Sequence, residues 1–177
     1  MIPNMYKIAG EQLPCVFDVS ARTVSSHALN IFGDHSDVYA CRQTGAAMLC
    51  ESSVQEVMDL TPVAHCAALE GKLPFINFFD GFRTSHEIQK IEKWDYADLK
   101  EMCNMDAVAA FRAHALNPEH PAMRGSHENG DVFFQHREAC NTAYNELPAI
   151  VEKYMAKVNE KLGTNYDLFN YYGAEDA

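Results

Sequence analysis

The chain has 177 residues, of which 47% are hydrophobic, so it is long enough for one domain with a sizeable buried core. Its 25 Asp and Glu residues outnumber its 14 Lys and Arg residues, and the resulting formal net charge of −11 would be repelled by a nucleic-acid backbone. No apolar run approaches the roughly 18 residues of a membrane-spanning helix. Residues 1–4 lack the basic and apolar regions of a signal peptide, so we expect a cytoplasmic protein.

Hydrophobic spacing predicts alternating helices and strands in the first part of the chain. Ile2, Met5 and Ala9 share one helical face, while the apolar run that ends at Ser20 is too short for a helix and has Pro14 near its start. In chain order, we expect a helix over 1–12, a strand near 15–20, a short helix over 23–31, a loop over 33–37 and a strand near 46–50.

A capped helix and a buried strand follow, and with the preceding strand they form a β-α-β unit. Ser53 and Glu56 have the capping-box spacing, which predicts a helix over 53–70. Residues 74–79 are apolar except for Asn77, and near-continuous apolarity indicates a strand that is covered on both faces. We therefore expect an α/β fold with a mainly parallel sheet flanked by helices and a right-handed crossover.

The remainder of the chain predicts helices joined by a long loop. Asp95 and Asp106 are suited to cap short helices, and Gly163 follows an apolar stripe that includes Ile150 and Tyr154. In chain order, we expect helices over 95–103 and 106–116, an irregular loop over 117–131 and a helix over 148–162.

Charged side chains follow the expected strands, and parallel strands bring such residues to one edge of a sheet. Arg22 follows the first strand, and its planar guanidinium can bind a carboxylate through two parallel hydrogen bonds. A surface or interdomain salt bridge is the alternative role for Arg22. Weaker candidates for a binding cleft at this edge are Arg42, Asp80, Arg83 and His86. The alternative for Arg42 is a structural ion pair, and the alternative for Arg83 and His86 is packing of their loop.

Two groups of possible metal ligands lack the spacing of a metal site. One comprises Asp34, His35 and Asp37, and the other comprises His114, His120, His127 and His136. Neither group has helical i, i+4 spacing, and no H-E-x-x-H or C-x-x-C motif accompanies them. We therefore expect no metal site, and a metal hydrolase built on these His and Asp residues is the alternative. The six cysteines lie mostly in apolar runs, so we expect them to be reduced, buried thiols.

Five long strings of this sequence carry a family resemblance. They are MIPNMYKIAGE (1–11), FGDHSDVYACRQTG (32–45), SSVQEVMDL (52–60), FFDGFRTSHEIQKIE (78–92) and ALNPEHPAMRG (115–125). They closely resemble, in order, the front part of pyruvate:ferredoxin (flavodoxin) oxidoreductases. The resemblance implies a fragment, in which residues 1–165 are a thiamine diphosphate-binding pyrimidine domain, incomplete at its amino terminus, and residues 166–177 begin a linker.

The resemblance also implies an activity, namely the oxidative decarboxylation of pyruvate to acetyl-CoA and CO₂. The cofactors would be thiamine diphosphate, Mg²⁺ and 4Fe–4S clusters, and the partners would be coenzyme A and ferredoxin or flavodoxin. The segment VSAR matches the family's substrate arginine, so the resemblance assigns the carboxylate of pyruvate to Arg22. No cofactor-binding residue can be assigned in this chain, so we expect the fragment to bind no cofactor tightly and to be inactive alone.

Other readings of the resemblance stay open. The chain could be the front part of a pyruvate:NADP⁺ oxidoreductase, which has a different acceptor domain, or a stand-alone binding module without catalytic activity. The complete enzyme is expected to be a homodimer in the cytoplasm, with a hydrogenosome-like organelle as the alternative location.

Overall fold

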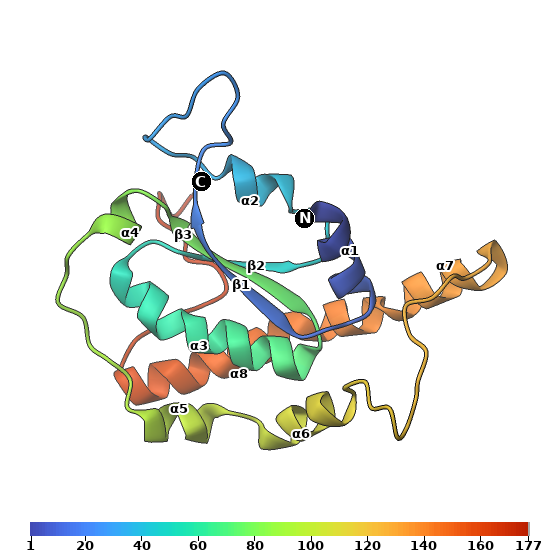
Figure 1. Ribbon diagram of the computed structural model, residues 1–177. Coiled ribbons are helices and arrows are strands. Elements are labelled where there is room, and N and C mark those ends of the chain that lie inside the picture. The colour runs from blue at the N-terminus through green and yellow to red at the C-terminus, as the bar shows by residue number, and fades with distance from the viewer. Residues whose placement is uncertain (177) are drawn as a thin grey trace.

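The computed structural model describes residues 1–176 and contains a three-stranded parallel sheet. Its strands are β1 (Cys15–Ala21), β2 (Ala47–Glu51) and β3 (Pro74–Asp80), in the order β1-β3-β2. β3 pairs with β1 on one side and with β2 on the other, in parallel in both cases (Figure 1). The predicted strands and the α/β fold are confirmed.

The central position of β3 follows from its composition. Pro74 through Phe78 are all buried, as near-continuous apolarity predicts. The exception in composition is Asn77, which is 0% exposed. Its Nδ2 donates to Asp18 Oδ1 at 3.0 Å and to Thr61 Oγ1 at 3.1 Å. The buried strand can contain this amide because its N–H groups have partners.

Helices cover both faces of the sheet (Figure 1). On one face lie α3 (Val54–Gly71) and α8 (Asn141–Leu162), and on the other lie α1 (Ile2–Gly10) and α2 (Ser36–Ala40). The larger core is on the α3 side and includes Val63, Ala64, Ala67, Phe75, Tyr154 and Val158. The smaller core is on the α1 side and includes Met5, Ala21, Val38, Ile76 and Phe78.

α3 crosses over from β2 to β3, as its capping residues predict. Ser53 Oγ accepts a hydrogen bond from Glu56 N at 3.1 Å. The return bond reaches the preceding residue, since Glu56 Oε2 accepts from Ser52 N at 2.6 Å. At the other end, Lys72 has a left-handed conformation with φ of 54°, so α3 ends at Gly71 and the chain turns into β3.

α8 begins earlier than expected. The predicted start at Pro148 is wrong, because Pro148 lies inside the helix. Proline favours the first turn of a helix, which led to that prediction. The preceding residues are stabilised by tertiary contacts: Leu147 is 8% exposed, and Tyr144 Oη donates to Gly45 O at 2.9 Å. Packing therefore extends the helix on the amino-terminal side of Pro148.

The segment between β1 and α2 is a loop, and the helix expected over 23–31 is wrong. Its apolar side chains are exposed, so burial does not stabilise a helix there. The exposed residues are Val24, Leu29, Ile31 and, just beyond, Phe32. The helix of this region is α2, which includes the end of the loop expected over 33–37. Asp34 Oδ1 accepts from Ser36 N at 2.9 Å and so satisfies an amide at the start of α2.

Short helices follow β3. They are α4 (Arg83–His86), α5 (Tyr96–Met102) and α6 (Met105–Ala113). Asp95 caps α5 as predicted, because its Oδ1 accepts from Ala97 N at 3.0 Å. The predicted cap of α6 by Asp106 is wrong, since Asn104 Oδ1 accepts from Asp106 N at 3.1 Å. Asn104 immediately precedes the first turn of α6, where an amide side chain caps as well as a carboxylate.

A long irregular segment precedes α7 (Gly130–Ala139), in agreement with most of the loop expected over 117–131. α7 begins inside the end of that loop and extends away from the sheet (Figure 1). None of its residues is buried. A helix without a buried face has no strong hydrophobic periodicity, which explains why the sequence did not predict α7.

The packed body continues past α8, which ends as predicted at Gly163 in the left-handed conformation. Tyr166 Oη donates to Asp59 Oδ2 at 2.9 Å, and Leu168 packs against the larger core. The packing therefore extends beyond the domain boundary expected at residue 165. Across residues 1–176, every helix is too short or too polar to span a membrane.

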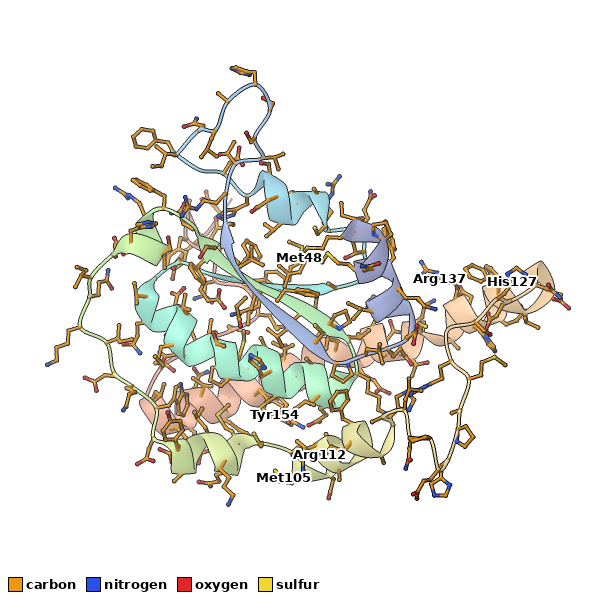
Figure 2. The ribbon with its side chains drawn as sticks, in the orientation of Figure 1. Met48, Met105, Arg112, His127, Arg137 and Tyr154 are labelled. Atoms are coloured by element: carbon orange, nitrogen blue, oxygen red, sulfur yellow. The ribbon has the colours of Figure 1, made fainter. Side chains whose placement is uncertain are left out.

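A polar contact joins α3 to α8 and to the turn before α6. Glu70 accepts hydrogen bonds from Tyr154 Oη at 2.6 Å and from Asn104 Nδ2 at 3.1 Å, and it pairs with Lys153. Tyr154 is 0% exposed and is labelled in Figure 2. Burial alone would raise the pKa of Glu70, but hydrogen bonds from Lys153, Tyr154 and Asn104 outweigh burial and lower this pKa to about 2.

We predict that Glu70→Gln destabilises the chain by about 1–3 kcal/mol at pH 7, because charge-assisted hydrogen bonds become neutral ones. The pKa of Glu70 in the folded chain lies below its ordinary value of 4.5. Its ionised form therefore stabilises the fold above pH 4.5, and this stabilisation is lost as the pH falls toward 2. Urea unfolding should show a difference between wild type and variant that shrinks from pH 7 to pH 3. Glu152→Gln, at an exposed position of α8, is the matched control, and an equal loss in both variants would contradict the prediction.

Candidate functional site

The three strands end at one edge of the sheet, as their parallel order requires. Ala21 at the end of β1 pairs with Asp80 at the end of β3, and Glu51 at the end of β2 pairs with Phe79. The residues that follow these ends are therefore neighbours across the edge. Ligands of open α/β sheets bind outside the carboxyl ends of the strands, so the candidate site lies here.

Arg22 directly follows β1, and two neighbours fix its position. Its backbone N–H donates to Asp37 Oδ2 at 2.8 Å. Its side chain lies against Gly81, where an added Cβ would be 2.5 Å from Arg22 Nε and 2.7 Å from Arg22 Cδ. Glycine at position 81 therefore leaves the space in which the arginine side chain crosses the turn after β3.

The guanidinium of Arg22 lies on no carboxylate in the described chain. Arg22 is half-buried, and no Asp or Glu oxygen of residues 1–176 comes within 4.0 Å of its nitrogens. The salt bridge considered as an alternative is thus not formed within these residues. A half-buried guanidinium at a ligand edge is suited to bind an incoming carboxylate through two hydrogen bonds.

The weaker candidates at this edge make local contacts. Asp80 Oδ1 accepts from the backbone N–H of Arg83 and from the neighbouring Phe82 N at 2.9 Å, and these bonds lower the pKa of Asp80. His86 Nδ1 lies 2.8 Å from Ser85 Oγ. Asp80 therefore stabilises the backbone of the loop after β3, and the ring of His86 contacts the adjacent serine.

Arg42 lies toward the opposite end of the sheet, because it precedes the start of β2. Its Nη1 donates to Tyr39 O at 2.8 Å, near the carboxyl end of α2. A cation at that end of a helix is favourable. This contact is of the structural kind considered as the alternative for Arg42, and the structure does not bring Arg42 together with Arg22.

Glu51 is a buried carboxyl group at the candidate site, to which the sequence assigned no role. It is 1% exposed, and neither of its oxygens has a hydrogen-bond partner in the described chain. Burial, followed by the nearby charge of Asp18, raises the pKa of Glu51 from 4.5 to about 8, so this carboxyl group is mostly protonated at neutral pH. The sequence feature that could have revealed it is a glutamate directly after the apolar residues of β2.

The possible metal ligands do not gather in the described part of the chain. Among residues 1–176, no group of three or more His, Cys, Asp or Glu side chains could bind a metal ion. Asp37 instead supports Arg22. The expectation of buried thiols needs correction: Cys66 is buried, Cys50 is exposed, and the other four cysteines are half-buried. Cys50 is exposed because it lies on β2, which is at the edge of the sheet.

A parallel α/β sheet whose strands all end at one edge is typical of ligand-binding domains. Residues 1–156 match the family model described as "Pyruvate flavodoxin/ferredoxin oxidoreductase, thiamine diP-bdg", that is, thiamine diphosphate-binding. The chain belongs to this family, and the family resemblance identified from the five sequence strings is confirmed.

Curated relatives match the chain over its whole length. They include a pyruvate-flavodoxin oxidoreductase of Enterobacter agglomerans at 63% identity, a pyruvate:ferredoxin oxidoreductase of Moorella thermoacetica at 59% and a pyruvate dehydrogenase (NADP⁺) of Cryptosporidium parvum at 51%. The chain spans 15%, 15% and 9% of these relatives, respectively. It therefore corresponds to a small part of each.

We predict that Glu51→Gln removes a pH dependence of stability. Between pH 4.5 and about 8, Glu51 carries a proton in the folded chain and loses it on unfolding. Stability therefore falls as the pH rises, by about 1.4 kcal/mol per pH unit. Glutamine is neutral and similar in shape, so the variant should lose this slope and exceed wild type in stability at pH 8. Urea unfolding at pH 5 and pH 8 measures both quantities.

Glu160→Gln is the matched control for Glu51→Gln, because Glu160 is exposed on α8. It should keep the pH slope of the wild-type chain. An unchanged slope in Glu51→Gln would show that Glu51 is ionised in the folded chain.

Proposed function

We propose that this chain supplies the pyruvate-binding arginine of an oxidoreductase that converts pyruvate to acetyl-CoA and CO₂ and passes electrons to ferredoxin or flavodoxin. The observation that carries the proposal is the half-buried guanidinium of Arg22 at the ligand edge, with no carboxylate on it among residues 1–176. Membership of the family supports the reaction, because the relatives are named for pyruvate and for these electron carriers.

Arg22 would act by placing pyruvate. A guanidinium binds a carboxylate with defined geometry, and so fixes where the adjacent carbonyl carbon lies. The carboxylate is also the group that leaves as CO₂, so very tight binding would stabilise the ground state. The useful contribution is therefore orientation. Asp37 at the backbone and Gly81 beside the side chain support this role, since both restrict where Arg22 can lie.

The family's cofactor, thiamine diphosphate, fits this chain only as part of a larger site. When bound, it supplies the carbanion chemistry at the carbonyl carbon of the substrate. A diphosphate bound through Mg²⁺ needs a set of oxygen ligands, and residues 1–176 offer no such group. We propose that Mg²⁺, the diphosphate, 4Fe–4S clusters and coenzyme A bind elsewhere in a longer, cytoplasmic and homodimeric protein.

A second electron acceptor has specific support. Two relatives at 51% and 48% identity are named pyruvate dehydrogenase (NADP⁺), from Cryptosporidium parvum and Euglena gracilis. The same front part therefore occurs in proteins named for a different acceptor. NADP⁺ is accordingly the alternative acceptor, and reduction of ferredoxin, flavodoxin and NADP⁺ by the full-length protein distinguishes the candidates.

We predict that Arg22→Leu in the full-length protein lowers kcat/KM for pyruvate by about ten- to over a hundredfold. Loss of charge-assisted hydrogen bonds worth roughly 1.5–3 kcal/mol gives this range. Folding and cofactor binding should change little, because the guanidinium has no carboxylate partner in the described chain. Steady-state kinetics with pyruvate, together with the melting temperature, measure both effects.

Arg42→Leu is the matched control for Arg22→Leu, since it removes the same charge at a residue that contacts only the end of α2 in the described chain. It should leave kcat/KM within a few-fold of wild type. Unchanged turnover in Arg22→Leu, or unfolding of the domain, would make Arg22 a structural residue and would overturn the proposed role.

We predict that the 177-residue chain alone does not bind thiamine diphosphate and Mg²⁺ tightly, because residues 1–176 contain no group of side chains that could bind the Mg²⁺ ion. Isothermal titration calorimetry of the chain with both components measures the affinity. A micromolar dissociation constant would contradict the assignment of this chain to one part of a shared site.

A further inference from the structure

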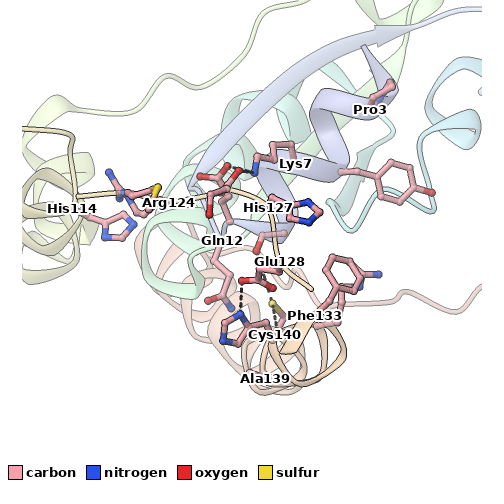
Figure 3. A pocket seen from close by; sticks show the side chains of 18 residues that line it. Pro3, Lys7, Gln12, His114, Arg124, His127, Glu128, Phe133, Ala139 and Cys140 are labelled. Atoms are coloured by element: carbon pink, nitrogen blue, oxygen red, sulfur yellow. Dashed lines mark hydrogen bonds and ion pairs between the residues drawn. The ribbon is translucent and has the colours of Figure 1, made fainter. Parts of the chain in front are cut away.

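An open cavity of about 1070 Å³ lies far from the carboxyl edge of the sheet, between α1, residues 123–128 and α7 (Figure 3). α1 precedes β1 and so lies near the amino-terminal ends of the strands. α4 follows the carboxyl end of β3, and α7 lies on the opposite side of the molecule from α4 (Figure 1). The cavity is therefore separate from Arg22, and its size is that of a small-molecule site.

The irregular segment that forms one wall is attached to α1 by specific contacts. Lys7 Nζ donates to Gly125 O at 2.6 Å and pairs with Glu11 at 2.9 Å. Gly125 has φ of 61°, which favours glycine, and an added Cβ would be 2.7 Å from Glu11 Cδ. Residues 123–128 thus have a defined position on α1, and the cavity wall depends on the absence of a side chain at Gly125.

The lining of this cavity has a small excess of positive charge, with Lys7, Arg124 and Arg137 against Glu11 and Glu128, although the chain has a net charge of −11. The lining acids already have partners, since Glu11 pairs with Lys7 and Glu128 lies 2.6 Å from His136. Arg124 and Arg137 also line the cavity, and no carboxylate of residues 1–176 comes within 4.0 Å of their nitrogens. With the imidazoles of His114 and His127, they leave an excess of hydrogen-bond donors.

Aromatic and apolar side chains form the other part of the lining. Tyr6 and Phe133 are 41% and 56% exposed, and Pro3 and Met123 also line the cavity. A lining that contains both unpaired guanidinium groups and exposed aromatic rings is suited to a ligand with an anionic group and a flat ring. A guanidinium group binds phosphate oxygens through two parallel hydrogen bonds. Aromatic rings stack on the bases of nucleotides.

We propose that this cavity binds the phosphate group of a small molecule, with the guanidinium of Arg124 or of Arg137 as its main ligand. Two sources share this chemistry, namely a nucleotide, whose base would contact Phe133, and inorganic phosphate. Figure 2 shows Arg137 and His127 at the α7 end of the molecule, and Arg112 on α6, outside the lining. Arg112 therefore provides a matched control.

The experiment is isothermal titration calorimetry of the full-length protein with ADP and with inorganic phosphate. Arg124→Ala combined with Arg137→Ala should weaken binding at this cavity by about tenfold or more, because charge-assisted hydrogen bonds are lost. Arg112→Ala should leave it unchanged. Binding at other anion sites is the same in both variants, so the difference between their affinities reports binding at this cavity alone. No detectable binding at the cavity, or equal binding in both variants, overturns the proposal.

Two further variants keep the test decisive if the double variant fails to fold. Gly125→Ala displaces the wall without removing a charge, so it should weaken binding of both probes several-fold. Phe133→Ala should weaken only ADP if the ligand is a nucleotide, and neither probe if the source is inorganic phosphate. Wild-type affinities in Gly125→Ala would show that the cavity is not the binding site.

Discussion

β3 is paired on both sides and covered on both faces, and this constraint fixes the place of nearly every other element. Parallel pairing requires a crossover between neighbouring strands, so α3 must lie over one face. α1 and α2 bury the opposite face, and α8 completes the layer around α3. Within this arrangement, the amide N–H groups of Asn77 have specific partners, whereas the buried carboxyl group of Glu51 has none in the described chain.

The same pairing explains why a functional edge exists. Register brings Ala21, Asp80 and Glu51 to one end of the sheet, and the residues that follow have no further strand to form. The position of Arg22 then depends on two neighbours, a carboxylate at its backbone and a glycine beside its side chain. Substrate binding at such an edge would be controlled by the turn after β3 as much as by the arginine itself.

Strong hydrophobic patterns predicted the fold well, whereas the contacts between polar side chains of distant segments could not be predicted from the sequence. The apolar runs of β1, β2 and β3 and the cap at Ser53 identify the sheet and its crossover, because burial and capping leave local patterns. α7 leaves no such pattern, since none of its residues is buried. At the candidate site, the position of Arg22 at the edge was predicted from its place after a strand, and its role was implied by the family resemblance. Its contacts with Asp37 and Gly81 were not predicted, because they join distant segments.

Pairing through β3 also restricts the order in which the fold can be assembled during synthesis. β1 and β2 are made first, yet they do not pair with each other, and the strand that joins them starts only at Pro74. α8, which covers α3, is made later still. Long-range pairing of this kind is slow, and unpaired strands can associate with other chains. A nascent chain with this topology therefore carries two exposed strands, and avoiding their premature association is a requirement of its biosynthesis.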